Sequence, residues 1–223
     1  MRRLVIGGTI WLALFTAIPA AQRAPGPYVG VLAGVSTLSA DARSDITDRG
    51  NVDVSLYTPE NGPAISVLFG IHVHKYVSLQ ANYVWNANDV ALTSVRGVDS
   101  SFYEQPRSSG QHAVIGDLLL YFRNLDSAVR PYLSVGGGAV RIVTTSLGES
   151  RERGTIPPAQ TIRALNGVLR TAVGIDIALS RHWAVRYTFS ETLSGNPFSA
   201  ALTPPGQRKL ANFQSLVGIV RAF

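Results

Sequence analysis

The sequence predicts an all-β protein, folded as one closed antiparallel sheet of eight strands. Apolar side chains alternate with small or polar ones at a period of two, which is typical of strands because successive side chains face opposite sides. Short and long connections alternate between these segments, as expected for an up-and-down series of hairpins. The 21 glycines and 12 prolines also favour turns over long helices.

The same alternation recurs in each expected strand. Between Val77 and Asn86, apolar positions such as Leu79 and Tyr83 alternate with Ser, Gln and Asn. Helical spacing does not produce this pattern, whereas a pleated strand does. The strands are expected near 27–38, 63–73, 77–86, 111–122, 130–144, 162–179, 183–192 and 209–223.

The connections fall into two length classes. The expected short turns cover 74–76, 123–129 and 180–182. The expected long polar connections cover 39–62, 87–110, 145–161 and 193–208. Long connections are uncommon in compact domains and are usually functional or mobile. We therefore expect four mobile loops that emerge on one side of the barrel.

Composition excludes several classes of protein. Hydrophobic residues make up 46% of the chain and charged residues 15%, which argues against extensive disorder. The absence of cysteine excludes disulfides, cysteine-based zinc sites and thiol nucleophiles. The formal net charge is +6, but the basic residues are scattered, so no nucleic-acid partner is expected.

The N-terminus has the pattern of an export signal. Arg2 and Arg3 precede an apolar stretch over 4–18, and the small residues Ala20 and Ala21 follow. A basic head, a short apolar middle and a small-residue cleavage site are typical of a secretory signal peptide. We expect a signal peptide at 1–21 and a barrel domain at 22–223.

The chemistry of the two strand faces predicts where the barrel resides. The less apolar face is rich in Gly, Ser, Asn, Gln and Thr, and it also holds Asp117, Arg170, Asp176 and Arg186. Small residues suit the narrow interior of eight strands, and the four charged side chains could form ion pairs there. An outward apolar face then contacts lipid, which predicts an eight-stranded antiparallel up-and-down transmembrane β-barrel. A soluble secreted β-barrel that binds an apolar ligand is the alternative.

Aromatic side chains cluster near the expected strand ends, as they do at the two interfaces of membrane barrels. The expected membrane-interface aromatics are Tyr76, Phe122, Trp183 and Phe223 near the short turns and Trp85, Phe189 and Phe213 nearer the long connections.

The chain resembles the OmpA-like family of small outer-membrane β-barrels. Its first strand, Tyr28 to Ser36, looks like the family's opening strand, and the Arg130-Pro131-Tyr132-Leu133 segment is similar to the fifth. The ending Gly218 to Phe223 looks like the signal that the barrel-assembly machinery reads, with Gly218 and Phe223 as its key residues. Arg221 departs from the aromatic residue that is usual there.

The resemblance implies a bacterial outer-membrane protein with a structural or surface-interaction role and four long extracellular loops. It covers the barrel domain but no peptidoglycan-binding domain. The expected partners are outer-membrane lipid and lipopolysaccharide, together with the barrel-assembly machinery. From their residue type alone, the arginines of the long connections, such as Arg107 and Arg208, either form part of a solvated surface of mixed charge or contact lipopolysaccharide. A monomer is expected.

No motif for catalysis, a metal or a cofactor is found in the sequence. His72 and His74 lie two residues apart and are expected to share a strand face, but a metal site needs further ligands. No pattern of nucleophile, base and orienting group is evident, so the chain is expected not to be an enzyme and to need no cofactor. A barrel-type outer-membrane enzyme acting on lipid or peptide is the alternative.

Overall fold

The computed structural model describes residues 25–39, 43–46, 52–59, 61–148, 150–154, 159–202 and 204–223. The signal peptide expected at 1–21 lies outside the described residues. In chain order the elements are β1 (Pro27–Ser39), β2 (Arg43–Ile46), β3 (Val52–Pro59), β4 (Asn61–His74), β5 (Val77–Val95), β6 (Phe102–Tyr121), β7 (Val129–Ser146), β8 (Arg151–Arg153), β9 (Thr161–Ala178), β10 (Trp183–Gly195), the 3-10 turn η3 (Ser199–Ala201) and β11 (Lys209–Ala222).

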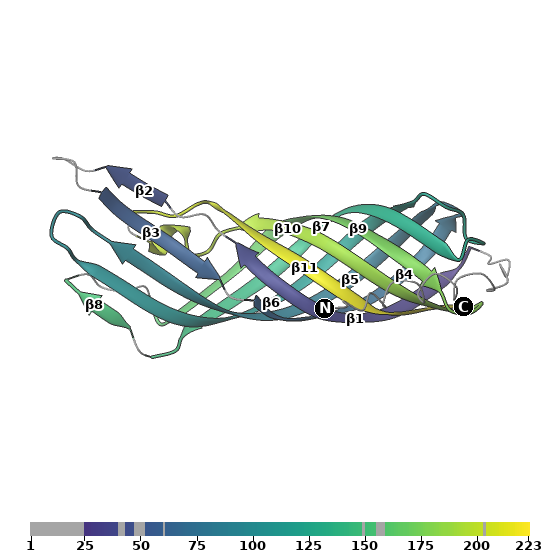
Figure 1. Cartoon of the computed structure of the whole chain (residues 1–223), viewed down its shortest axis with the longest axis horizontal. Coiled ribbons are helices and arrows are strands. Elements are labelled where there is room, and N and C mark those ends of the chain that lie inside the picture. Colours follow the sequence, from purple (N-terminus) through teal and green to yellow (C-terminus); the bar gives the residue numbers. More distant parts are fainter. Residues whose placement is uncertain are drawn as a thin grey trace, which may run out of the picture.

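Eight of these strands form a closed ring. Each pairs antiparallel with its neighbours in the order β1, β4, β5, β6, β7, β9, β10 and β11. The ring closes where β1 pairs along β11, from Tyr28 opposite Ala222 to Ser39 opposite Ala211. Closure leaves no unpaired strand edge in the ring. The predicted eight-stranded antiparallel barrel is confirmed (Figure 1).

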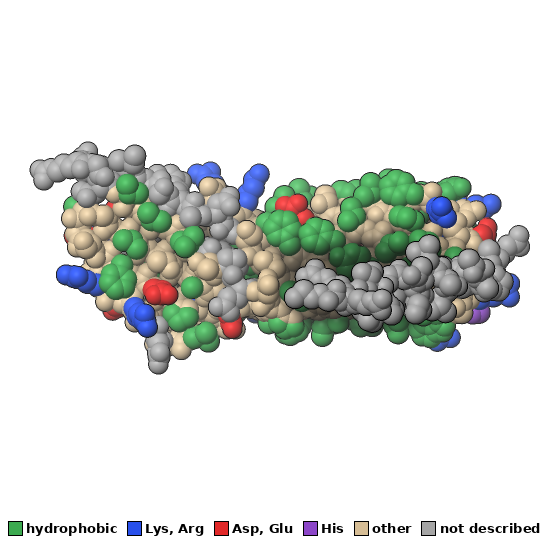
Figure 2. Space-filling view, viewed as in Figure 1, with side chains coloured by type: hydrophobic (Ala, Val, Ile, Leu, Met, Phe, Trp, Pro, Cys, Tyr) green, Lys and Arg blue, Asp and Glu red, His purple; other side chains and the backbone are tan. Residues whose placement is uncertain are grey.

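Side chains alternate between an apolar outside and a mixed inside. On β9, Val173 is 49% exposed, whereas the adjacent Ala172 is 6% exposed. Figure 2 shows hydrophobic side chains gathered over the half of the molecule that holds the short turns. We call this outer surface the apolar band. These exposures confirm that the apolar residues face outward, as predicted. An apolar exterior is what a lipid environment requires.

The unpaired connections at the end of the barrel opposite the short turns are shorter than the sequence indicates. β5 and β6 pair without a break as far as Val95 opposite Phe102, so most of the expected 87–110 loop is a β-hairpin. Its inward residues Val90, Leu92 and Tyr103 are buried, while outward residues such as Asp89 are polar. Beyond the apolar band the outer face is no longer uniformly apolar, because it meets water there. The pattern of apolar residues outside and polar residues inside therefore ends, although the strands continue.

Further strands extend the sheet beyond the apolar band. β3 pairs with the outer part of β5, from Val54 opposite Val95 to Pro59 opposite Val90, and β2 pairs with β3. β8 pairs with the start of β6. We call the sheet formed by β2, β3, β8 and residues 87–110 the platform; it lies at the left of Figure 1. The expectation of mobile loops at 39–62 and 87–110 is therefore wrong for these paired residues.

The two ends of the barrel differ. The turns after β4, β6 and β9 lie at the same end as the C-terminus, where Phe223 N donates to Pro27 O at 3.1 Å. We name this the periplasmic end and the opposite one the extracellular end, following the orientation expected from the sequence, because outer-membrane barrels have short periplasmic turns and longer extracellular connections. No helix among the described residues is long and apolar enough to cross a membrane.

Exchanging Val173 for Arg tests the assigned facing. The guanidinium would enter the apolar band, so we expect Val173→Arg to destabilise the protein folded in lipid vesicles by about 2–4 kcal/mol. Ala172→Ser, one residue away but facing the lumen, should cost much less. Folding titrations measure both variants, and equal costs would contradict the facing.

Candidate functional site

The periplasmic half of the lumen is held together by a buried ion pair. Arg186 on β10 donates from Nε to Asp176 Oδ1 at 2.6 Å and from Nη2 to Oδ2 at 2.7 Å. The same guanidinium donates to Gln80 Oε1 at 2.5 Å and to the Tyr121 hydroxyl at 2.8 Å. Tyr28 donates to Gln80 Oε1 at 3.0 Å. Side chains from β1, β5, β6, β9 and β10 thus meet across the lumen.

A second buried ion pair lies further along the lumen. Arg170 on β9 donates from Nη1 to Asp117 Oδ2 at 3.0 Å, and Asn82 donates to the same oxygen at 2.6 Å. Gln80 donates to Asn82 Oδ1 at 2.7 Å and so connects this pair to the first one. The structure therefore brings Asp117, Arg170, Asp176 and Arg186 into one interior network, with each Arg paired to one Asp.

Two tyrosines fill the lumen beside glycines on the neighbouring strand. Tyr28 lies opposite Gly70, and Tyr132 lies opposite Gly174. A Cβ atom at either glycine would collide with the facing ring. Glycine at these positions lets a large ring cover the backbone of the next strand, an arrangement that helps to hold strand register.

An amide layer follows towards the extracellular side. Asn212 on β11 donates to Gln111 Oε1 at 3.1 Å and to Asn86 Oδ1 at 3.3 Å. Asn86 donates in turn to Asn88 Oδ1 at 2.8 Å, and Ser36 donates to Asn212 Oδ1 at 2.7 Å. Amides both donate and accept, so side chains of this layer bond one another across the narrow lumen, while Gln111 Nε2 is buried without a hydrogen-bond partner among the described residues.

The extracellular mouth is closed by an apolar plug, which we define as Phe198 and Leu202 from the β10–β11 connection. Both side chains are buried and join a cluster that includes Leu92 on β5 and Tyr103 on β6. The Tyr103 hydroxyl donates to Ala201 O at 3.2 Å and holds the η3 turn in place. This connection packs into the lumen, so the expectation of a mobile loop at 193–208 is wrong for the described residues.

Arg107 is buried inside the protein and does not lie at its surface. It is fully buried and donates to the Ala159 and Gln160 carbonyl oxygens at 2.9 and 3.1 Å. It also donates to Gln105 Oε1 at 2.5 Å. Its expected contact with lipopolysaccharide is wrong, because on the inner face of the β5–β6 hairpin it ties the β7–β9 connection to β6.

Comparison with known proteins identifies the family. The model of the outer membrane protein beta-barrel domain matches residues 8–214.

The chain belongs to this family of outer-membrane β-barrels.

One solved structure supports the fold, and two others are more weakly similar to this chain. The crystal structure of Neisserial surface protein A is 12% identical, covers 89% of this chain and 97% of its own, and has a TM-score of 0.52. OprG from Pseudomonas aeruginosa is 15% identical over 90% and 97%, with a TM-score of 0.47. The N-terminal barrel of OprF from the same organism is 12% identical over 90% and 100%, with a TM-score of 0.45. No curated protein matches the sequence.

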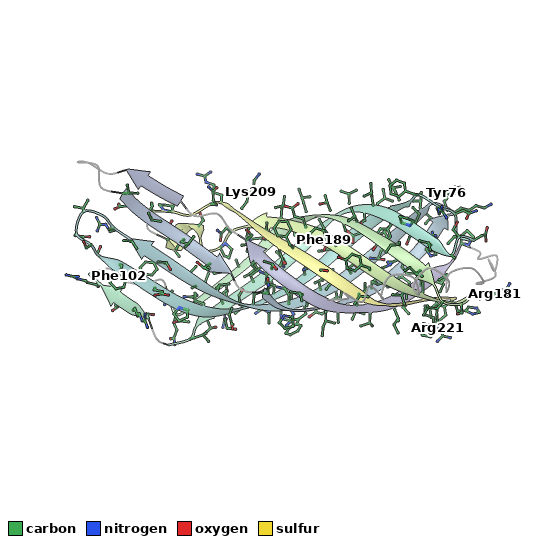
Figure 3. The ribbon with its side chains drawn as sticks, in the orientation of Figure 1. Tyr76, Phe102, Arg181, Phe189, Lys209 and Arg221 are labelled. Carbon is green, nitrogen blue, oxygen red and sulfur yellow. The ribbon has the colours of Figure 1, made fainter. Side chains whose placement is uncertain are left out.

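The aromatic residues expected to form the membrane-interface girdles face outward, and their position at the membrane interfaces stays a prediction. Tyr76 is exposed at the periplasmic end and Phe189 lies towards the other end (Figure 3). Trp183 is also exposed, and the rings of Phe189 and Phe213 stack with their centroids 6.4 Å apart. Phe122 and Phe223 are also exposed, and Trp85 is partly exposed. In the terminal strand, Gly218 lies opposite Leu32 of β1 on one side and opposite Arg186 of β10 on the other.

Arg221, the departure from the family pattern, has an aromatic setting of its own. Its guanidinium lies 5.5 Å from the Trp183 ring centroid and 5.0 Å from that of Phe223. Cation–π contacts of this kind let a basic residue stay among interfacial aromatics while its charge remains solvated.

The histidines do not gather into one site. A register shift between His72 and His74 turns His72 into the lumen and leaves His74 exposed, so the expectation that they share a face is wrong. His72 Nδ1 lies 2.5 Å from Ser78 Oγ, and both residues are buried in the lumen. No group of three potential metal ligands occurs among the described residues.

The plug was missed in the sequence. Phe198 and Leu202 are apolar residues in a stretch otherwise rich in Pro, Ser and Gly, and that contrast is the signal that could have indicated a buried segment. Their destination could not be read from the sequence, because it depends on Leu92 and Tyr103, which are about 100 residues away along the chain.

Exchanging Arg186 for Met tests the first ion pair. The variant removes the paired guanidinium from buried Asp176 and leaves that carboxylate with the Tyr121 hydroxyl and with Arg130, which lies opposite it on β7. We therefore expect a loss of about 3 kcal/mol in the free energy of unfolding, the lower end of the range for breaking a buried ion pair. Arg186→Met combined with Asp176→Leu should cost less than the two single exchanges added together. Urea unfolding in vesicles measures this coupling, with exposed Arg181→Met as a near-neutral control; strict additivity would contradict the pairing.

Proposed function

We propose that this protein is a non-conducting outer-membrane scaffold that displays the platform and the neighbouring connections for interactions at the cell surface. The observation that carries the proposal is the continuous strand pairing of β5 and β6 far beyond the apolar band. A hairpin paired in this way holds its tip at a defined position, as recognition surfaces on rigid scaffolds require. The four connections at 39–62, 87–110, 145–161 and 193–208 are the proposed extracellular segments.

The tip of the β5–β6 hairpin is held by specific contacts. Gly97 N donates to Asp53 Oδ1 at 3.0 Å, which ties the tip to β3. Ser101 N donates to Asp99 Oδ1 at 3.0 Å, and hydrogen bonds from Ser101 lower the pKa of the Asp99 carboxyl. Arg96 lies 3.6 Å from Asp99 and completes a charged, exposed turn. An ordered turn of this chemistry supports a role in binding at the surface.

The filled lumen supports a role other than permeation. Eight strands leave space mainly for side chains. Here the two ion pairs, the amide layer and the plug succeed one another from the periplasmic end to the extracellular mouth. A solute would have to separate several buried hydrogen bonds at once, each of which is costly to leave unmade.

Planar bilayer recordings test the closed lumen. We expect the refolded chain to give no stepwise ion conductance, because the plug and the ion pairs block the lumen. A sixteen-stranded porin in the same bilayer serves as the positive control. Reproducible conductance steps from the purified chain would show that the lumen is open and that permeation is part of its role.

Trypsin treatment of intact cells tests the display of the platform. Arg96 is exposed in the hairpin tip, so we expect cleavage after Arg96 and loss of that fragment in Arg96→Gln. Lys75 and Arg181 lie in exposed turns at the opposite end and should be cut only after the outer membrane is permeabilised. Mass spectrometry identifies the fragments, and cleavage at Lys75 or Arg181 in intact cells would reverse the orientation.

A further inference from the structure

The outer surface of the barrel has an open groove of about 560 Å³ across β7, β9 and β10. Its floor is made of backbone at Gly137, Gly167 and Gly195, where larger side chains would complete the apolar band. A Cβ atom at Gly167 would meet no atom within 4 Å, so the groove is open directly above this residue. The groove therefore exists because side chains are absent from the wall, without any distortion of the strands.

The sides of the groove are apolar along its periplasmic part. Leu169 lies opposite Gly137 on one side and opposite Leu193 on the other. Leu169 is 69% exposed, and Leu193 is exposed beside it. A glycine floor between exposed leucines fits a saturated hydrocarbon chain, which packs closely against an exposed backbone when no side chain intervenes.

The extracellular end of the groove is basic. Arg208 and Lys209 line it, and Lys209 lies opposite Gly195 at the border of the apolar band (Figure 3). Both side chains are exposed, and no ion pair joins either of them to an acidic residue within the described part of the chain. Glu191 lies further towards the periplasm and borders a neighbouring groove together with Phe189.

The backbone that carries these two cations is held in place. Asn196 donates from its backbone N to Arg208 O and from Nδ2 to Gln207 O, both at 2.8 Å. Asn166 donates from Nδ2 to Gly195 O, also at 2.8 Å, and anchors the edge of the floor. Arg208 and Lys209 are therefore presented from a fixed position over the groove rather than from a free loop.

We propose that this groove binds a phosphorylated glycolipid of the outer leaflet, with one acyl chain over Gly167 and a headgroup phosphate at Arg208 and Lys209. An apolar channel that ends in two cations without an ion pair to any described residue complements an acyl chain that ends in an anionic headgroup. A second copy of this chain fits less well, because a two-fold contact on the same groove would bring the cations of both copies together. The inference rests on the proposed orientation of the barrel, which places 193–209 outside.

Native mass spectrometry of barrels released from phosphatidylcholine bilayers doped with lipid A tests the proposal. The wild-type chain is expected to retain one lipid A. Gly167→Leu should abolish this retention by filling the groove, and it should still fold because its added atoms enter open space. Arg208→Ala with Lys209→Ala should weaken retention about 30-fold, which corresponds to about 2 kcal/mol for two basic groups near the surface.

Two matched controls accompany these variants. Gly110→Leu makes the same exchange at another open position of the barrel wall, since a Cβ atom at Gly110 also meets no atom within 4 Å. Lys75→Ala with Arg181→Ala removes one Lys and one Arg from the periplasmic turns. Both controls should retain lipid A like the wild type.

Several results would overturn the proposal. These are wild-type retention of lipid A no greater than that of phosphatidylcholine, undiminished retention by Gly167→Leu, equal loss in Gly110→Leu, or a dimer in place of bound lipid that Gly167→Leu disrupts. Trypsin treatment of intact cells reports the orientation separately, so a failure of lipid binding is distinguishable from a failure of the proposed scaffold role.

Discussion

The constraint on which the structure depends is that no backbone N–H or C=O group may remain unpaired in hydrocarbon. The β1–β11 pairing meets it, because it joins the first and last strands of the barrel and removes both edges of the sheet. Once the sheet is closed at eight strands, the width of the lumen is set. The interior must then be filled by side chains that satisfy one another, and the exterior must be apolar.

The interior is polar near the periplasm and apolar at the mouth. The Arg186–Asp176 and Arg170–Asp117 pairs lie where all surrounding strands face lipid, and their charges are compensated within the lumen. At the mouth the ring widens into the platform, and Phe198 and Leu202 occupy the space with apolar contacts. The barrel is therefore a packed core whose polar part lies inside the membrane.

The exterior is not uniform either. Glycines on the outer face of β7, β9 and β10 interrupt the apolar band and leave a groove at its extracellular border, beside Arg208 and Lys209. Glycine has different roles on the inner and outer faces of the barrel wall. Inside the lumen, glycine makes room for the rings of Tyr28 and Tyr132, whereas outside it leaves space that the surrounding lipid can enter.

The sequence alone determined the number of membrane-crossing strands, their facing and the four charged residues of the interior network, because a period of two under lipid constraint is a local signal. It did not indicate Tyr28, Gln80 and Tyr121, which the structure adds to that network. Strand ends were predicted well at the short turns but not beyond Asn86 and before Gln111, where water replaces lipid and the alternation weakens although pairing continues. Only the tertiary structure decided which Arg meets which Asp, that His72 turns inward, and that Phe198 enters the mouth. These outcomes depend on register and on contacts between distant segments, and no local pattern in the chain encodes them.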